Sequence, residues 1–309
     1  MARLKEVDTR PRRQRTAAGR QVGTICELWR YPVKSMLGAT LDEVVVTPNG
    51  FLGDRAWALR DVESGRIASA KKFPRLLEFR ATYEVEPGEE SPGRVRIETP
   101  DGDAIYPEDP EASRLISELL GRDVRLENQA REDERTIIDR ETVFGDVPLE
   151  EMKSDWSPEV MSDWTPETMP DYFQLKKNTF FEIGSVFVLA SGSVDHLLAL
   201  QGGTALIDRR RFRPNFFIDT SPERGRFVED DWLGATLAIG SDLLLDDFQP
   251  TQWCVTSTLA QEELPRDLSI LRTTAKNHKG CLGVYASVRS AGLSRVGDPV
   301  VCRAPSGVG

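Results

Sequence analysis

Short runs of alternating apolar and polar residues, separated by Gly, Pro and Asp, recur along most of this chain. Residues 22–46 alternate in this way, and similar runs follow at 55–61, 77–85 and 94–100. The pattern returns after residue 180 and continues to residue 301. Alternation with a period of two, ended by turn residues, is typical of strands with one buried face. The chain is therefore expected to be mainly β, as a barrel or a sandwich.

Two stretches break this pattern and predict helices. Residues 109–120 begin with Asp and Pro, place their leucines at helical spacing, and stop at Gly121. A Gly directly after such a stretch is a common helix end, because it adopts the left-handed cap conformation. A second helix is expected at about Ser193–Leu200. The expected fold class is therefore mainly β with a few helices (α+β).

Changes in composition divide the 309 residues into two β-rich units. The expected parts are a basic tail (1–20), a first β-barrel-like unit (21–126), an acidic connector (127–178), a second such unit (179–303) and a short tail (304–309). The connector holds a tandem repeat, SDWSPEVM followed by SDWTPETM, at 154–169. Two copies are too few for a solenoid. Trp156 and Trp164 are expected either to fold back onto the body or to dock a partner.

Charge and hydropathy exclude several classes of partner. The net charge is -10 and the pI is about 5.0, which argues against electrostatic capture of nucleic acid or of an anionic membrane. No apolar run approaches the roughly 20 residues that a transmembrane helix needs. Small molecules and other proteins are the expected partners.

The N-terminus and the cysteines favour a cytoplasmic location. The first 20 residues lack the apolar middle of a secretory signal, and Glu6 and Asp8 argue against a transit peptide. The four cysteines lie far apart without any CxxC pair. That spacing fits neither a disulfide framework nor a structural zinc site.

Three motifs contain side chains that suit an anion. Tyr-Pro-Val-Lys-Ser at 31–35 places the Lys34 charge and the Ser35 hydroxyl after a strand, and Gly-Phe-Leu-Gly-Asp-Arg-Ala-Trp at 50–57 presents Arg55 on a glycine-rich turn. Arg-Arg-Arg-Phe-Arg-Pro-Asn at 209–215 is a dense cationic run in an acidic protein. Each motif has a structural alternative: a solvated lysine, a packed turn or a salt-bridge cluster.

A fourth motif, Pro-Thr-Gln-Trp-Cys-Val-Thr at 250–256, places Cys254 among hydroxyl residues. A thiolate in such a position can bind a metal, although most buried cysteines are inert apolar residues. Cys26, Cys281 and Cys302 are expected to be of the inert kind.

Taken in order, these motifs resemble a known family. YPVKS, GFLGDRAW, RRFRPN, EDDWLGATLAIG, PTQWCV and RVGDPV are similar to the hallmarks of MOSC proteins with an N-terminal MOSC β-barrel domain, the group that includes the amidoxime-reducing components. The resemblance covers roughly residues 22–301. Six motifs in the family's order are far more specific than any one of them.

The resemblance implies a molybdenum cofactor (Mo-molybdopterin) that lies between the two packed units. It implies that Lys34, Ser35 and Arg55 hold the cofactor phosphate, that Arg213 and Asn215 bond the phosphate or the pterin edge, and that Cys254 is the catalytic ligand to molybdenum. The implied activity is reduction of N-hydroxylated compounds such as amidoximes and hydroxylamines. The chain lacks the CxxxxCxxC cysteines of fused iron-sulfur relatives, so a separate electron-transfer protein of ferredoxin or flavoprotein type is expected.

Two positions depart from the family pattern. Trp253 stands where relatives carry a basic residue, and its ring could narrow the pocket or shift substrate preference. His196 stands where relatives often have an acidic residue. Two other hypotheses therefore stay open beside the reductase: a non-catalytic carrier or sulfuration protein for the cofactor, and a β-barrel interaction module without any cofactor.

Overall fold

The structure is a computed structural model that describes residues 19–88, 91–128, 180–181, 184–203, 207–221, 223 and 225–304. Strands dominate, and three α-helices are present within these ranges, which confirms the expected mainly β fold class. The tandem repeat at 154–169 lies outside the described residues, so the expectation about Trp156 and Trp164 stays a prediction.

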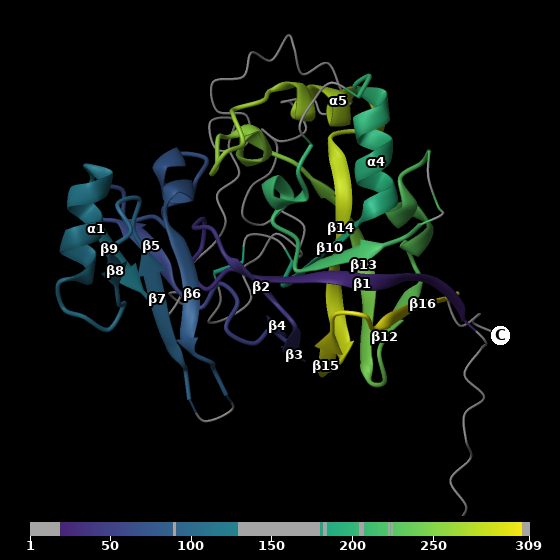
Figure 1. Cartoon of the computed structure of the whole chain (residues 1–309), viewed down its shortest axis with the longest axis horizontal. Helices are drawn as coiled ribbons and strands as arrows, with labels where there is room; N and C mark the ends of the chain where they lie inside the picture. The colour runs from purple at the N-terminus through teal and green to yellow at the C-terminus, as the bar shows by residue number, and fades with distance from the viewer. Residues whose placement is uncertain are drawn as a thin grey trace, which may run out of the picture.

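Seven strands close into a β-barrel, seen on the right of Figure 1. Their order is β11-β10-β14-β13-β12-β16-β1, and pairing of β11 with β1 closes the ring. The strands are β1 (Arg20–Arg30), β10 (Val186–Ala190), β11 (Phe216–Asp219), β12 (Thr236–Ile239), β13 (Leu243–Gln252), β14 (Cys281–Ser290) and β16 (Pro299–Arg303). Apolar side chains from all seven strands fill one continuous core cluster. On β11 and β13, buried residues (Phe216 and Ile218, Leu243 and Leu245) alternate with less buried ones, as the sequence pattern predicts for inward-facing positions.

The first strand of the chain belongs to this barrel. β1 pairs with β11 and, through its first residues, with β16. The last residues of β1, Leu28–Arg30, pair with β2 (Ala39–Leu41). Two register shifts interrupt these pairings, so the buried residues Val22, Ile25 and Leu28 recur every third position. A β-bulge places one extra residue in a strand and has this effect. Strand pairing thus crosses the expected boundary between the two units.

The N-terminal elements from β5 to β9 lie on the left of Figure 1. They are β5 (Ala58–Asp61), η1 (Pro74–Glu78), β6 (Arg80–Val85), β7 (Arg94–Glu98), β8 (Ala104–Ile105), α1 (Ala112–Leu120) and β9 (Val124–Glu127). β6, β7 and β8 form one sheet, and β5 pairs with β9. α1 ends at Gly121, whose φ of 67° gives the left-handed cap that the sequence predicts.

A small sheet and a second core cluster join the two halves. β3 (Glu43–Thr47) pairs with β4 (Gly50–Phe51) and with β15 (Gly292–Arg295). The second cluster combines Ala70 and Leu77 of the first half with Phe187, Phe212 and Trp253 of the second. Cys254, from the fourth motif, packs against this cluster.

Helical segments cover one end of the barrel, at the top of Figure 1. They are α4 (Ser191–Leu200), η4 (Arg209–Phe212), η5 (Val228–Trp232), η6 (Val255–Thr258) and α5 (Ser269–His278). α4 matches the helix expected near Ser193, whereas α5 was not expected. Among the described residues, no helix combines the length and the apolar character that crossing a membrane requires.

Candidate functional site

A buried carboxylate, Asp54, connects three of the sequence motifs. Its Oδ1 accepts a hydrogen bond from the Tyr31 amide at 2.7 Å. Its Oδ2 accepts one from Asn215 Nδ2 at 2.9 Å and forms an ion pair with Arg55. The side chain has no exposed surface. Because a buried charge needs partners, this carboxylate fixes the positions of three segments that are far apart in the sequence.

Two arginines contact the ring of Tyr31. The guanidinium carbons of Arg55 and Arg213 lie 4.7 Å and 4.2 Å from the ring centroid. Both distances are within the range of a cation–π contact. Burial works against the charge of Arg55, but the adjacent Asp54 carboxylate outweighs it and keeps the pKa of Arg55 raised. The site therefore gathers two permanent cations at one place.

Backbone conformation marks the same residues. Six non-glycine residues in the described part of the chain have positive φ, and three of them are Ser35 (68°), Arg55 (46°) and Arg213 (52°). Residues with side chains rarely adopt this region, and such strained conformations cluster at functional sites. Three of the five residues predicted to bind the cofactor thus share a conformation that needs support from the surrounding fold.

Lys34 and Ser35 lie on the loop between β1 and β2. Lys34 Nζ donates a hydrogen bond to the carbonyl of Phe180 at 2.8 Å. The Ser35 hydroxyl accepts one from the Ala70 amide at 3.0 Å, beside the second core cluster. The ring of Phe181 lies 5.7 Å from the Arg55 guanidinium carbon, which brings the start of the second half next to the same group.

Asn215 is enclosed by protein groups. Its Oδ1 accepts a hydrogen bond from the Phe187 amide at 3.0 Å, and its Nδ2 donates to the Trp29 carbonyl at 3.2 Å as well as to Asp54. The residue is 1% exposed. Its amide therefore links β1, β10 and the turn that presents Arg55.

Cys254 lies where β13 passes into η6, and it is partly buried against the second core cluster. Its thiol donates to the Thr256 hydroxyl at 3.3 Å. The preceding ring, Trp253, packs edge-on against Phe212 with centroids 5.0 Å apart, and Phe212 directly precedes Arg213. This contact brings the cysteine motif and the cationic run together.

The two departures from the family pattern lie in aromatic surroundings. Trp253 is 9% exposed, and its indole N–H donates to the Leu282 carbonyl at 2.8 Å. The ring thus contributes to the core. His196 packs edge-on against Phe227 at 4.9 Å.

The other three cysteines are suited to remain thiols. Burial raises the pKa of Cys26 and of Cys281 to about 11, and nearby carboxylates act in the same direction. Burial also raises the pKa of Cys302. A thiol with a raised pKa is a poor nucleophile and a poor metal ligand.

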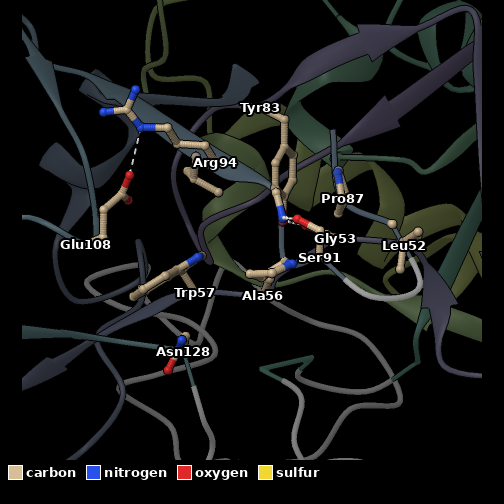
Figure 2. Close-up of a pocket in the computed structure, with 14 residues that line it drawn as sticks. Leu52, Gly53, Ala56, Trp57, Tyr83, Pro87, Ser91, Arg94, Glu108 and Asn128 are labelled. Carbon is tan, nitrogen blue, oxygen red and sulfur yellow. Dashed lines mark hydrogen bonds and ion pairs between the residues drawn. The ribbon is translucent and has the colours of Figure 1, made fainter. Parts of the chain in front are cut away.

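A pocket of roughly 860 Å³ is lined by residues on either side of Arg55 in the sequence (Figure 2). Gly53, Ala56 and Trp57 line it together with Tyr83, whose hydroxyl donates to the Gly53 carbonyl at 3.1 Å. None of the six predicted site residues lines this pocket. We therefore place the candidate site at the Asp54 and Tyr31 cluster, where the cationic side chains gather.

Sequence reasoning identified the cations of this site but not the groups that hold them. Tyr31 and Asp54 stand inside two of the motifs, and Asp54 directly precedes Arg55. The sequence signal that could have indicated a structural role for Asp54 is its place directly before Arg55 in a glycine-rich turn. Nothing in the sequence indicated that the Tyr31 ring would contact both arginines.

Comparison with known proteins gives matches along most of the chain. The MOSC N-terminal beta barrel domain matches residues 22–134, and the MOSC domain matches residues 176–301. "Mitochondrial amidoxime-reducing component 1" of Mus musculus is 27% identical over 94% of this chain and 85% of its own length. "Mitochondrial amidoxime reducing component 2" of Bos taurus is 26% identical over 94% and 86%. The YUAD protein from Bacillus subtilis aligns in structure with a TM-score of 0.43 at 10% identity, over 91% of this chain and 96% of that one.

The two matched domains follow one another in the order that the six motifs have along the chain. Together with the relatives that match 94% of the chain, they show that this protein belongs to the family of MOSC-domain proteins that carry an N-terminal MOSC β-barrel domain.

Proposed function

We propose that this protein is a molybdenum-cofactor-dependent oxidoreductase that reduces N-hydroxylated compounds, such as amidoximes and hydroxylamines. One observation carries the proposal: Arg55 and Arg213 meet at Tyr31, beside the segment that contains Cys254. The relatives that match 94% of the chain are named amidoxime-reducing components, which supports the same chemistry.

The cationic group fits the anionic end of such a cofactor. In this proposal Lys34, Ser35 and Arg55 hold the phosphate, and Arg213 binds the phosphate or the pterin edge. A guanidinium presents a planar fork that matches phosphate oxygens, and charge-assisted hydrogen bonds of this kind are strong. Asn215 is proposed to hold these residues in position, because its amide already bonds to Asp54 and to the Phe187 backbone.

Cys254 is proposed as the protein's ligand to the metal. A soft thiolate suits a metal that is already bound by sulfur. The Thr256 hydroxyl lies 3.3 Å from the sulfur and can donate a hydrogen bond to a metal-bound thiolate. When bound, the molybdenum group supplies the two-electron reduction that removes the oxygen of an N–OH group as water, while the protein supplies binding and orientation.

Electrons are proposed to arrive from a separate ferredoxin or flavoprotein. The relatives' names call each of them a component, which fits a system of several proteins. A cytoplasmic location stays a prediction, because the same names are mitochondrial. Fractionation of cells that express the natural full-length chain tests it.

The decisive experiment measures molybdenum and pterin in protein purified from a host that makes the cofactor. We expect near-stoichiometric molybdenum in the parent and loss of the metal in Cys254→Ala. Cys302→Ala is the matched control and should keep the metal, since that thiol is held protonated by burial. A parent without molybdenum or pterin would contradict the proposal. A loaded protein that reduces no amidoxime or hydroxylamine with any supplied donor would instead favour the carrier function.

A further inference from the structure

We infer that Tyr31 is a positioning residue: its ring holds Arg55 and Arg213 together so that both guanidinium groups can bind one phosphate-type anion. This inference rests on the proposed function, since it concerns the same anion site. The Tyr31 ring contacts both arginines, whose guanidinium carbons lie 4.7 Å and 4.2 Å from its centroid.

The positive charges of Arg55 and Arg213 repel each other, so a nearby group must offset this repulsion. The faces of an aromatic ring carry negative potential and attract cations more strongly where water is excluded. Tyr31 is 3% exposed. Burial raises the pKa of its hydroxyl against the pull of Arg213 and Arg55, so the ring stays neutral and its faces keep this role.

Tyr31 is also bonded to both arginine-bearing loops. The Arg55 amide donates to the Tyr31 carbonyl at 2.8 Å, and the Tyr31 hydroxyl donates to the Pro214 carbonyl at 3.4 Å, one residue after Arg213. Asp54 fixes the Tyr31 amide from the other side at 2.7 Å. The ring is therefore held at a defined place relative to both turns.

This arrangement explains why both arginines can tolerate positive φ. Arg55 and Arg213 each occupy the left-handed region, with φ of 46° and 52°. A side chain fixed at its charged end by a ring stabilises a backbone conformation that would otherwise be unfavourable. Removal of the ring should free both guanidinium groups to move apart, and phosphate binding should weaken.

The test measures inorganic phosphate binding to the cofactor-free full-length protein by equilibrium dialysis, with pterin content of the cofactor-loaded protein as a second readout. Tyr31→Phe keeps the ring and should bind phosphate within about twofold of the parent. Tyr31→Leu removes two cation–π contacts and should bind at least about tenfold more weakly. Circular dichroism and thermal unfolding establish that each variant is folded.

Fluorinated phenylalanines at position 31 provide a test that does not depend on the leucine variant. Fluorine withdraws charge from the ring faces with little change in shape, so phosphate affinity should fall stepwise with the number of fluorines. A purely structural role would leave the affinity flat across the series, and that result would overturn the inference. Equal binding by folded Tyr31→Leu would do the same. A parent that binds neither phosphate nor pterin would instead refute the proposed function itself.

Discussion

Glu229 is a carboxyl group enclosed at the start of α4, and its ionisation should set how the protein's stability depends on pH. The side chain accepts hydrogen bonds from the Ala190 amide at 2.7 Å and from the Ser193 hydroxyl. Burial raises its pKa to about 7, against the opposing effect of these hydrogen bonds. The residue is 2% exposed, so little water reaches it.

The magnitude follows from the difference between the folded and unfolded pKa values. The shift from 4.5 to about 7 corresponds to about 3 kcal/mol, at 1.36 kcal/mol for each pKa unit. Because the folded pKa is the higher one, the folded state binds the proton more tightly. The stabilisation is therefore full below the unfolded pKa and is lost as the pH rises through the folded pKa.

Glu229→Gln replaces the acid with a neutral group of the same shape. As the pH rises from about 4 to about 8, the parent should lose free energy of unfolding because Glu229 ionises, whereas the variant has no carboxyl group to ionise at this position. We expect the loss in the parent to exceed that in the variant by about 3 kcal/mol. Urea titrations followed by fluorescence measure this difference, since the buried Trp232 lies in the same short helix. Glu118→Gln, which changes a carboxyl that is 62% exposed, is the control and should keep the parental slope. Parallel pH profiles for the parent and Glu229→Gln would refute the reasoning.

Three further substitutions have defined outcomes. Asp54→Asn should destabilise the fold by about 3–5 kcal/mol in urea titrations, because it leaves the buried Arg55 charge without its carboxylate; a loss under about 1 kcal/mol would contradict this. Arg122 donates hydrogen bonds to both carboxylate oxygens of Asp61 and lowers the pKa of Asp61. The stabilisation from this ion pair is therefore full above the unfolded pKa and is lost as the pH falls through the folded pKa. Asp61→Asn should be about 2–3 kcal/mol less stable than the parent at neutral pH in urea titrations, and this difference should disappear in acid. Trp253→Ala should cost about 3–5 kcal/mol and Trp253→Phe clearly less, measured by thermal unfolding, and equal costs would argue against a core role.

Much of the fold was accessible from the sequence because its signals are local. The alternation predicts the strands, and Gly121 predicts the end of α1. α5 was missed because Ser269–His278 contains two adjacent threonines and an isoleucine, β-branched residues that favour strands. Its first turn is supported by Asp267, whose carboxylate accepts from the Ser269 amide at 2.9 Å.

The closure of the barrel and the inner part of the site were not accessible, because both depend on contacts between distant residues. Alternation shows that β1 is a strand but not that its neighbours are β11 and β16. The sequence likewise offers Asn215 as a donor to a ligand, whereas the fold encloses its amide among protein groups. Charge and residue type therefore indicate a candidate site, and packing decides which of its polar groups are bonded to other parts of the protein.

The place of β1 in the barrel has a consequence for how the protein is made. β1 (Arg20–Arg30) is synthesised long before its partner β16 (Pro299–Arg303). At about 5–20 residues per second, the interval between them is on the order of 15–60 s. Until then β1 can pair along one edge at most, and an unpaired strand edge can bind other chains. The barrel can close only after β16 has been synthesised, so the edge of β1 needs protection until then.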